Sequence, residues 1–325
     1  MTIVPYEGLR DPRDFFELME ACFGEVAAPE HPELLRRYDE RRQREFGFGI
    51  YRGRTLASFI GVAELKVGTR SGETETALGI HHVATHPAFA RRGLSRRLFD
   101  FVHDRYRREG RRFSFLYTSR TLVAPALYCD LGYTETPIAG PQAPRALLIL
   151  PPTNKPLRPN RTRVADLTAV ERVFAETIEE RPGFTIRQRG WPLARLKQWK
   201  QKTSDIFVDR DGYAFTQPDT FGRRIDEFIA RNRAAYVRLL DRIAAATRGG
   251  LVDYYVRDPM LRSIYRERGA RFRRQTYASL MVKPLTRVSF RPVFGTHFFQ
   301  SPVDQFQSGA SPVARRGLTT TAPDG

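Results

Sequence analysis

The sequence predicts an α/β sandwich, in which helices flank a mixed central sheet, and it predicts that this fold occurs twice. Within residues 1–150, short antiparallel strands are followed by strand–helix alternation, the order expected when helices cover a mixed sheet. A proline-rich segment at residues 151–162 interrupts this order, and residues 163–285 repeat it. Both halves also place a tyrosine four residues before a glycine, at Tyr128 and at Tyr265. We therefore expect an internal duplication joined by a linker.

The elements of the first half follow from the spacing of its apolar residues. Helical spacing predicts helices, and alternation or short apolar runs predict strands. The most regular helix begins at Leu94–Ser95 and stops at Gly110, because glycine ends helices. Strands are expected at residues 2–8, 46–53, 55–67, 76–87, 113–118 and 146–150, and helices at 11–24, 31–46, 94–110 and 121–132.

The second half has the same kind of pattern, followed by a tail. Residues 161–181 predict a strand and a helix; further helices are expected at 191–202, 232–250 and 258–269, and further strands at 206–217 (a hairpin), 224–230, 251–256 and 276–285. The tail, residues 286–325, begins with a stretch holding five phenylalanines, which favours a segment lying across a groove or a partner. Its last part is rich in small and polar residues, typical of disorder.

Composition bounds the classes of function. The formal charge is +18, but the 54 basic residues include only six lysines, and the arginines are spread along the chain. This favours an arginine-biased surface over a nucleic-acid-binding one, with phosphate-bearing cofactors or polyanions as the other explanation. Cys22 and Cys129 have no CxxC spacing, so neither a disulfide framework nor a metal site is expected. Neither a signal peptide nor a membrane span is visible, so we expect a cytoplasmic protein.

Residues 79–102 contain the pattern with the clearest chemistry. An apolar strand ends in Thr-His-Pro, a loop follows with Arg91, Arg92 and Gly93, and an amphipathic helix begins directly after it. A helix N-terminus presents unpaired N–H groups, which together with the two arginines suit a diphosphate. An ordinary strand-to-helix loop fits the same pattern, so local physics alone leaves both interpretations open.

Two motifs resemble the GNAT superfamily of N-acyltransferases. The run THPAFARRGLSRRLF resembles its acyl-CoA-binding motif, (Arg/Gln)-x-x-Gly-x-(Gly/Ala), with Ala90 in place of Arg/Gln and Ser95 in place of Gly/Ala. Ser95 is small and can cap the helix. The run TLVAPALYCDLGYTET resembles the family's Asn-x-x-Ala-x-x-Leu-Tyr-x-x-x-Gly-(Phe/Tyr) helix, with Thr121 where Asn is usual. The departures concern cofactor affinity more than fold.

The resemblance covers residues 1–150. Residues 163–285 resemble the same fold by element order and the Tyr265 signature only, and they lack a glycine in the corresponding loop. The chain thus resembles tandem GNAT proteins with one degenerate lobe.

The resemblance implies transfer of an acyl group from acyl-CoA, acetyl-CoA first among them, directly to an amine, without a metal. It implies that pantetheine runs beside the strand ending at Thr85 and that the diphosphate lies over the following loop. The implied cofactor-binding residues are Val83, Ala84, Thr85, Arg91, Arg92, Gly93, Leu94, Ser95 and Thr121. Tyr128 matches the family's acid, which protonates the leaving thiolate; a packing aromatic is the other interpretation.

The base that deprotonates the amine has three candidates. Strand alternation places His81 with Val83 and Thr85 on one face and His82 on the other. A histidine at His81 resembles the arylalkylamine branch of the superfamily, so His81 ranks first, His82 second and the carboxylate of Glu64 third. A hydrogen-bonded structural histidine is the competing interpretation. We expect Cys129 to fill core space.

Partners follow from the same pattern. The acidic loop at residues 23–33 suits a cationic amine on a small molecule or a peptide, although exposed glutamates also explain it. The second lobe and the tail are expected to close the site or to form a homodimer surface. The alternative function is a non-catalytic acyl-CoA-sensing or partner-docking protein on a GNAT scaffold, and nucleic-acid binding ranks last.

Overall fold

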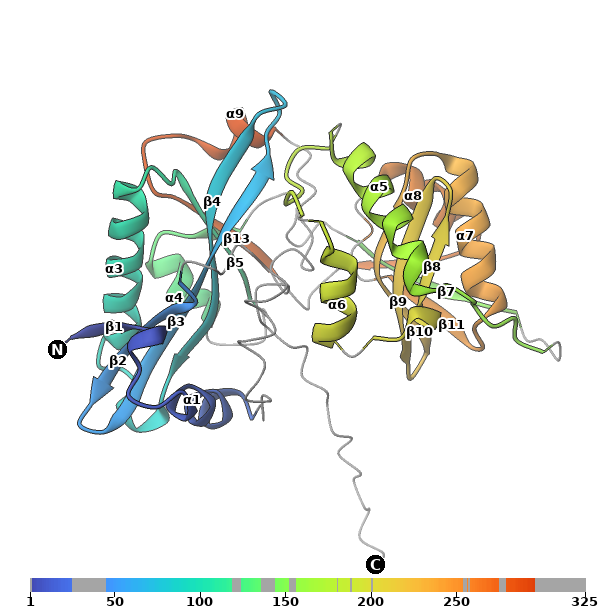
Figure 1. Cartoon of the computed structure of the whole chain (residues 1–325). Coiled ribbons are helices and arrows are strands. Elements are labelled where there is room, and N and C mark those ends of the chain that lie inside the picture. Colours follow the sequence, from blue (N-terminus) through green and yellow to red (C-terminus); the bar gives the residue numbers. More distant parts are fainter. Residues whose placement is uncertain are drawn as a thin grey trace, which may run out of the picture.

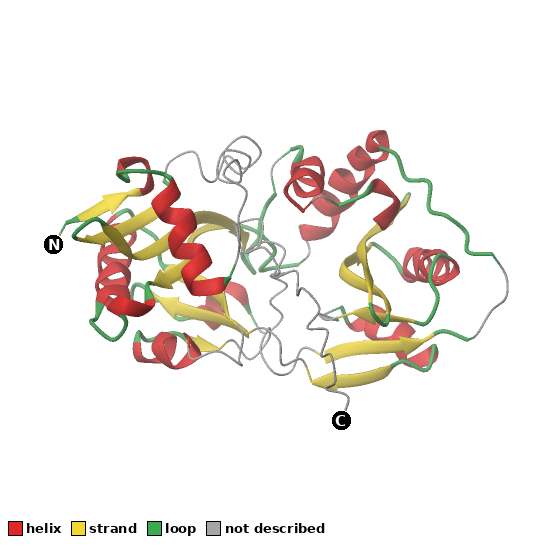
Figure 2. Cartoon of the chain, turned by 90° about the horizontal axis from the view of Figure 1, so that it is seen from below, coloured by secondary structure: helices red, strands yellow, loops and turns green. Residues whose placement is uncertain are grey.

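The computed structural model has two lobes, each with one mixed sheet flanked by helices, and the lobes lie side by side (Figure 1). Viewed from below, helices lie on both faces of each sheet (Figure 2). The structure describes residues 2–24, 45–118, 124–135, 144–151, 156–179, 181–187, 189–199, 201–253, 256, 258–274 and 279–295. The α/β sandwich and its duplication are confirmed.

The first sheet has seven strands in the order β1-β2-β3-β4-β5-β13-β6. Their bounds are β1 (Ile3–Pro5), β2 (Gly47–Arg52), β3 (Thr55–Gly68), β4 (Thr74–Thr85), β5 (Phe113–Thr118), β6 (Thr134–Glu135) and β13 (Ser279–Pro284). Strands β4 and β5 are parallel, and the other neighbours are antiparallel. The helices of this lobe are α1 (Arg13–Phe23), α3 (Leu94–Arg108), α4 (Ala124–Asp130) and α9 (Phe290–Phe294), with short 3-10 turns η1 (Tyr6–Gly8) and η3 (Pro87–Phe89).

The second sheet repeats this order in six strands, β8-β9-β10-β11-β7-β12. Their bounds are β7 (Pro144–Ile149), β8 (Ile206–Asp209), β9 (Gly212–Asp219), β10 (Gly222–Ala230), β11 (Gly250–Asp253) and β12 (Arg271–Arg274). The parallel pair β10–β11 corresponds to β4–β5. The helices are α5 (Leu167–Ile178), α6 (Trp191–Trp199), α7 (Arg233–Ala245) and α8 (Pro259–Glu267), with 3-10 turns η4 (Val164–Asp166) and η5 (Thr203–Asp205).

The lobes exchange one strand each. Strand β7, expected to complete the first sheet, pairs instead with β11 and β12 of the second. Strand β13, expected to complete the second sheet, lies between β5 and β6 of the first. Figure 1 shows it in the first lobe, next to β5. Both sequence-based sheet assignments were therefore wrong, because a short apolar run predicts a buried strand without specifying its neighbours. The domain boundaries at residues 150 and 163 stay predictions.

Other departures are local. Residues 161–163 form no strand, and the chain passes instead through η4 into α5. Strands β6 and β12 and helix α9 were not anticipated, since each is too short to show a period. The helix expected over residues 31–46 lies outside the described residues, apart from its last two positions.

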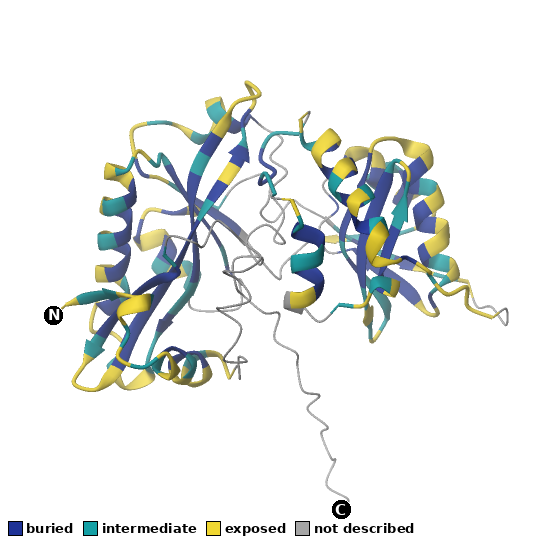
Figure 3. Cartoon of the chain, in the orientation of Figure 1, coloured by how far each residue is buried: buried dark blue, intermediate teal, exposed yellow. Residues whose placement is uncertain are grey.

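The two faces of the first sheet have separate cores. Helices α3 and α4 pack on one face, where the predicted residues Leu94, Leu98, Val102 and Tyr106 are buried. The other face is covered by α1 and by α9, whose Phe294 packs on the phenylalanines of β5. The beginning of the tail thus lies on the chain's own first lobe. The sequence had left open whether this segment lies across a groove or across a partner. Figure 3 shows the buried strands between helices with exposed outer faces.

The second lobe also covers an open sheet edge of the first. Pairing of β2 with β3 ends opposite Gly61, so the rest of β3 extends past its neighbour. Residues 183–186 pair there: the N–H of Ile186 donates to the C=O of Lys66 at 2.7 Å and the N–H of Gly68 to the C=O of Phe184 at 3.1 Å. Unpaired strand edges promote association, so this segment both joins the lobes and closes the edge.

Candidate active site

A β-bulge shapes β4 at the predicted site. Pairing with β3 shifts between Gly61–His81 and Phe59–Ala84, so that two residues of β4 oppose a single residue of β3. His82 takes a positive φ of 46°, a conformation that is unusual for a residue with a side chain. Bulges redirect side chains next to functional sites. The expected simple alternation along this strand was therefore wrong.

The bulge brings the rings of His81 and His82 into contact. Their Nδ1 atoms lie 2.6 Å apart, and His81 Nε2 lies 3.1 Å from the backbone oxygen of Val62. Both rings pack against Phe46, with centroids 5.3 and 5.6 Å away. His81 fits because residue 61 is glycine: a Cβ there would lie 2.1 Å from His81 Nδ1. A glycine inside a predicted strand was the sequence signal for such a close approach, and it was overlooked.

Beyond this point β4 and β5 separate. Their parallel pairing covers only Leu78–Ile80 against Ser114–Leu116, although both strands continue. Within the described residues, the backbone of β4 from His81 to Thr85 therefore has no ladder with β5, and we call this interruption of the pairing the gap between the two strands. The C=O of Thr85 accepts a hydrogen bond from the Cys22 thiol at 3.3 Å.

The predicted cofactor residues of β4 are held by side-chain hydroxyls. Ser58 Oγ donates to the C=O of Ala84 at 2.8 Å and lies 2.8 Å from Thr85 Oγ1. Thr85 Oγ1 in turn lies 2.6 Å from Ser95 Oγ, in the first turn of α3. Ser95 thus ties the helix start to the strand end and does not cap the helix, whose N-cap residue is Gly93. Val83 is half-buried.

The loop from β4 to α3 has an unusual backbone. Arg91 has a φ of 60° and Gly93 a φ of 72°, and in the described part of the chain His82 and Arg91 are the two non-glycine residues with positive φ. Such conformations cluster at functional sites. Arg91, Arg92 and Gly93 are exposed, whereas Leu94 is buried in the core. The first turn of α3 contains no acidic residue, so its dipole and the arginines favour an anion together.

Tyr128 lies near the end of α4, buried against α3. Its ring contacts Phe99 and Tyr133, with centroids 5.8 and 6.1 Å away. Its hydroxyl makes no hydrogen bond to another described residue. Burial raises the pKa of Tyr128 well above its usual value, so the group is protonated at neutral pH. The structure joins it to α3 rather than to the histidine pair, and Thr121 lies outside the described residues.

Two residues considered in the sequence analysis, Glu64 and Cys129, have environments that the sequence did not predict. Glu64, the third candidate base, forms an ion pair with Arg111, whose Nε lies 2.9 Å from its carboxylate. Cys129, expected in the core, is exposed. Among the described residues no cluster of three or more His, Cys, Asp or Glu side chains is placed to bind a metal.

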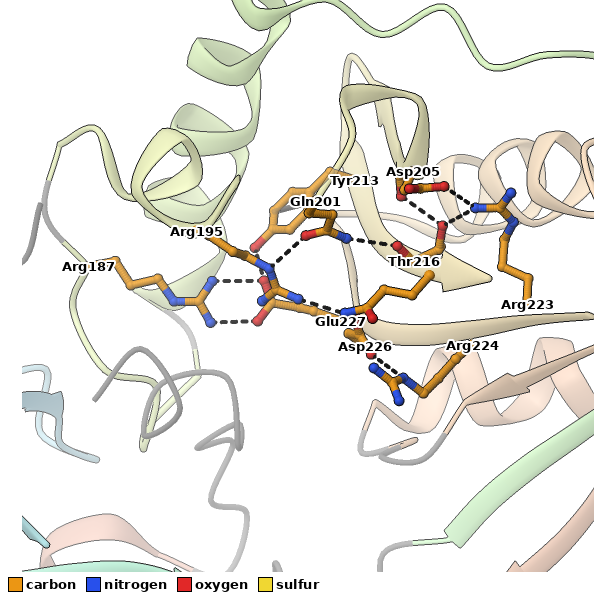
Figure 4. Close-up of polar contacts among 11 residues, drawn as sticks. Arg187, Arg195, Gln201, Asp205, Tyr213, Thr216, Arg223, Arg224, Asp226 and Glu227 are labelled. Atoms are coloured by element: carbon orange, nitrogen blue, oxygen red, sulfur yellow. Dashed lines mark hydrogen bonds and ion pairs between the residues drawn. The ribbon is translucent and has the colours of Figure 1, made fainter. Parts of the chain in front are cut away.

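The second lobe has a corresponding bulge, occupied by charges instead of imidazoles. Asp226 is the extra residue on β10, directly after the parallel pairing with β11. Next to it, Glu227 receives two hydrogen bonds from Arg187, at 2.8 and 2.5 Å, and one from Tyr213 at 2.8 Å (Figure 4). Arg187 and Glu227 are almost completely buried. Burial alone would raise the pKa of Glu227, but Arg187, together with Arg195 and the Tyr213 hydroxyl, outweighs it and lowers that pKa.

In the second lobe, the other positions that correspond to the first site also form hydrogen bonds and ion pairs within the protein. The hydroxyl of Tyr265 donates to Asp253 Oδ2 at 3.1 Å, and Arg181 forms an ion pair with Asp258 at 2.7 Å. Helix α7 begins almost directly after β10, with the Asn232 side chain as its cap. The loop that would hold a diphosphate is therefore absent here, as the missing glycine indicated.

Comparisons with known proteins agree with this geometry. Residues 9–136 match the family model described as acetyltransferase (GNAT) domain. The structure is similar to a GCN5-related N-acetyltransferase from Kribbella flavida, with 17% identity, 87% of this chain and 72% of that one covered, and a TM-score of 0.63. It is also similar to a GCN5-related N-acetyltransferase from Anabaena variabilis, with 16% identity, 85% of this chain and 70% of that one covered, and a TM-score of 0.60. A third similar structure is a tandem GNAT protein from the clavulanic acid biosynthesis pathway, with 11% identity, 89% of this chain and 99% of that one covered, and a TM-score of 0.50.

No curated protein sequence matches the chain. In the residues that the structure describes, no helix has the length and apolar character of a membrane span. Residues 9–136 thus match a GNAT acetyltransferase domain, and the whole chain has the fold of tandem GNAT proteins, with one sheet in each lobe. This family supports N-acyltransferase activity, with acyl-CoA as co-substrate and an amine as acceptor.

Proposed function

We propose that the first lobe transfers an acyl group, acetyl in the first place, from acyl-CoA directly to the amine of a small molecule or peptide. The observation that supports this most is the gap where β4 leaves β5, which leads to the loop of Arg91–Gly93 and the start of α3. The second lobe lacks that loop. We therefore place one acyl-CoA in each chain, in the first lobe.

The residues around the gap fit the co-substrate. The backbone of Val83–Thr85 would pair with the pantetheine amides, because β5 does not pair with it there. The N–H groups of Gly93, Leu94 and Ser95 and the side chains of Arg91 and Arg92 would hold the diphosphate. Exposed glycine at position 93 leaves space: a Cβ added there would meet nothing within 4 Å.

The chemistry assigns one proton transfer to each end of the reaction. An ammonium substrate loses a proton to the histidine pair, and its nitrogen then bonds to the thioester carbon. The C–S bond breaks with its electron pair on sulfur, which takes the proton of the Tyr128 hydroxyl. The surplus proton of the new amide nitrogen restores the tyrosine, and the histidine releases its proton to solvent. The reaction needs no metal.

Thermal stability in the presence of acetyl-CoA tests the binding part of this proposal. A ligand that binds only the folded state stabilises it by about 2.7 kcal/mol at a hundredfold excess over Kd, which raises Tm. Arg92→Glu should abolish that rise, because it places a like charge beside the diphosphate. Arg210→Glu is the matched control: it reverses an exposed arginine on a turn of the second lobe and should keep the rise. A full Tm rise in Arg92→Glu would contradict the diphosphate assignment.

The second candidate is a non-catalytic acyl-CoA-sensing or partner-docking protein, favoured by Ala90, which stands exposed where the family motif has Arg or Gln. Release of CoA from acetyl-CoA with a panel of amines separates the two. Tight binding of acetyl-CoA without release of CoA for any amine supports the sensor.

We place the reaction in the cytoplasm, where acyl-CoA is available. The homodimer stays a prediction, which light scattering tests.

A further inference from the structure

We infer that the two adjacent histidines divide the deprotonation of the amine between them. His82 accepts the proton at Nε2, and His81 is a positioning residue that sets the tautomer of His82. This inference rests on the proposed acyl transfer in the first lobe, and it goes further by assigning a separate task to each ring. It also reverses the order implied by the resemblance to the arylalkylamine branch, which ranked His81 first.

The tautomers follow from the partner of His81. A backbone carbonyl carries no proton, so His81 Nε2, 3.1 Å from the oxygen of Val62, has to be the donor. A neutral imidazole with its proton on Nε2 has a lone pair on Nδ1. The 2.6 Å contact between the two Nδ1 atoms then requires its proton to come from His82. Neutral His82 is therefore the Nδ1–H tautomer, with its lone pair on Nε2.

This arrangement makes His82 the better base of the two. His81 is buried, and both of its ring nitrogens take part in these hydrogen bonds, so protonating it would break one of them. When His82 takes a proton at Nε2, its Nδ1–H still donates to His81. That hydrogen bond becomes charge-assisted and stabilises the imidazolium. The logic is that of a base oriented by a third group, with a carbonyl-anchored imidazole as the orienting group.

The backbone keeps the pair in place. The bulge and the positive φ of His82 turn its ring toward His81, where simple alternation would place the rings on opposite faces. Glycine at position 61 leaves the space in which the His81 ring lies. Phe46 packs against both rings, and Phe15 contacts His82 at 5.5 Å between centroids. Each feature serves the same contact between the two imidazoles.

Nuclear magnetic resonance tests the tautomers without any acceptor. Two-bond proton–nitrogen spectra of the protein labelled with ¹⁵N-histidine distinguish Nδ1–H from Nε2–H imidazoles. With six histidines in the chain, His81→Gln and His82→Gln assign the two signals. At pH 8.5 (roughly two units above the ordinary histidine pKa), His82 should be the Nδ1–H form and His81 the Nε2–H form. The Nε2–H form at His82 would overturn the inference.

The pH profile of kcat/KM tests the roles. We would measure CoA release from acetyl-CoA with 2-phenylethylamine, spermidine and a short peptide with a free N-terminus, and use the fastest acceptor. His82→Gln should lower kcat/KM by about 10²–10⁴-fold and remove the acid limb of the profile. His81→Ala should give a smaller loss and displace that limb. His86→Gln, which removes an imidazole at the end of the same strand, should keep the limb.

Conservative and indirect variants separate positioning from general structural damage. His81→Gln should recover part of the activity lost in His81→Ala, because its amide can donate to Val62 and accept from His82. Gly61→Ala should reproduce His81→Ala while both histidines remain, since its Cβ would lie 2.1 Å from His81 Nδ1. An acid limb retained in His82→Gln, or His81→Gln no more active than His81→Ala, would overturn the assigned roles.

Failure of the inference and failure of the proposed function give different results. If the wild-type protein binds acetyl-CoA but releases no CoA with any acceptor, the proposed function is contradicted, and the resonance spectra still decide the tautomers. If the wild type is active and the variants above keep its acid limb, the transferase stands and the division between His81 and His82 falls.

Discussion

Tyr128 and Tyr133 lie in one core but have different hydroxyl environments, so removing the two hydroxyls should affect different properties of the protein. The Tyr133 side chain is 1% exposed, and its hydroxyl lies 2.6 Å from Ser114 Oγ and 2.8 Å from His103 Nε2. The Tyr128 hydroxyl bonds to no other described residue. We predict that Tyr133→Phe lowers stability and that Tyr128→Phe lowers turnover.

The magnitude for Tyr133→Phe follows from the two hydrogen bonds lost. Each is worth about 1 kcal/mol net, and a buried partner left unsatisfied costs about 1–3 kcal/mol. Because Ser114 and His103 are both buried, the expected loss in the free energy of unfolding is about 2–4 kcal/mol. For Tyr128→Phe the ring and its packing remain, so we expect a change within about 0.5 kcal/mol.

Urea denaturation followed by circular dichroism measures both values, and CoA release measures turnover. The midpoint should fall for Tyr133→Phe at an unchanged m value. Turnover should fall by about 10²-fold or more for Tyr128→Phe, while the Tm rise with acetyl-CoA stays. Equal loss of stability in the two variants would refute the reasoning from hydrogen bonds. Unchanged turnover in Tyr128→Phe would remove that residue as the acid.

Two further predictions concern His103 and the exchanged strands. Burial, and secondarily Lys283, lower the pKa of His103 to about 3. The unfolded chain, with a histidine pKa of about 6.5, therefore binds the proton first, and stability should be full above about pH 6.5 and fall toward pH 3 by up to about 1.4 kcal/mol per unit. His103→Gln should flatten this dependence in urea titrations at pH 7, 6 and 5, and an unchanged slope would contradict the assignment. Residues 1–150 and 151–325 expressed separately should fail to fold, because each sheet loses an internal strand, whereas coexpressed halves should copurify; a folded 1–150 fragment alone would show that β13 is dispensable.

Much of the fold could be predicted because its elements are local. The helix at residues 94–108 and the strands around it follow from apolar spacing and from glycine stops. The loop of Arg91–Gly93 could be singled out because arginines and a glycine before a helix are already a physical pattern for phosphate. The positive φ of Arg91 could not be predicted, because arginine has no preference for that backbone conformation.

The site itself was only partly predictable. The sequence places His81 and His82 on one strand, but the period of two assigns them to opposite faces, and only the bulge brings their rings together. Likewise Glu64 is a plausible base as a residue type, and only the structure shows that its carboxylate forms an ion pair with Arg111, far away in the chain.

The sequence by itself determined most of the helices and strands, and it predicted the diphosphate loop, the tyrosine and the histidines that we propose for the site. Those properties depend on neighbours a few residues apart. The tertiary structure alone decided that β7 and β13 exchange sheets, that Gly61 and Val62 position His81, and that charges fill the corresponding place in the second lobe. These depend on pairing between distant segments, where many strands of similar apolar character compete and only packing selects one.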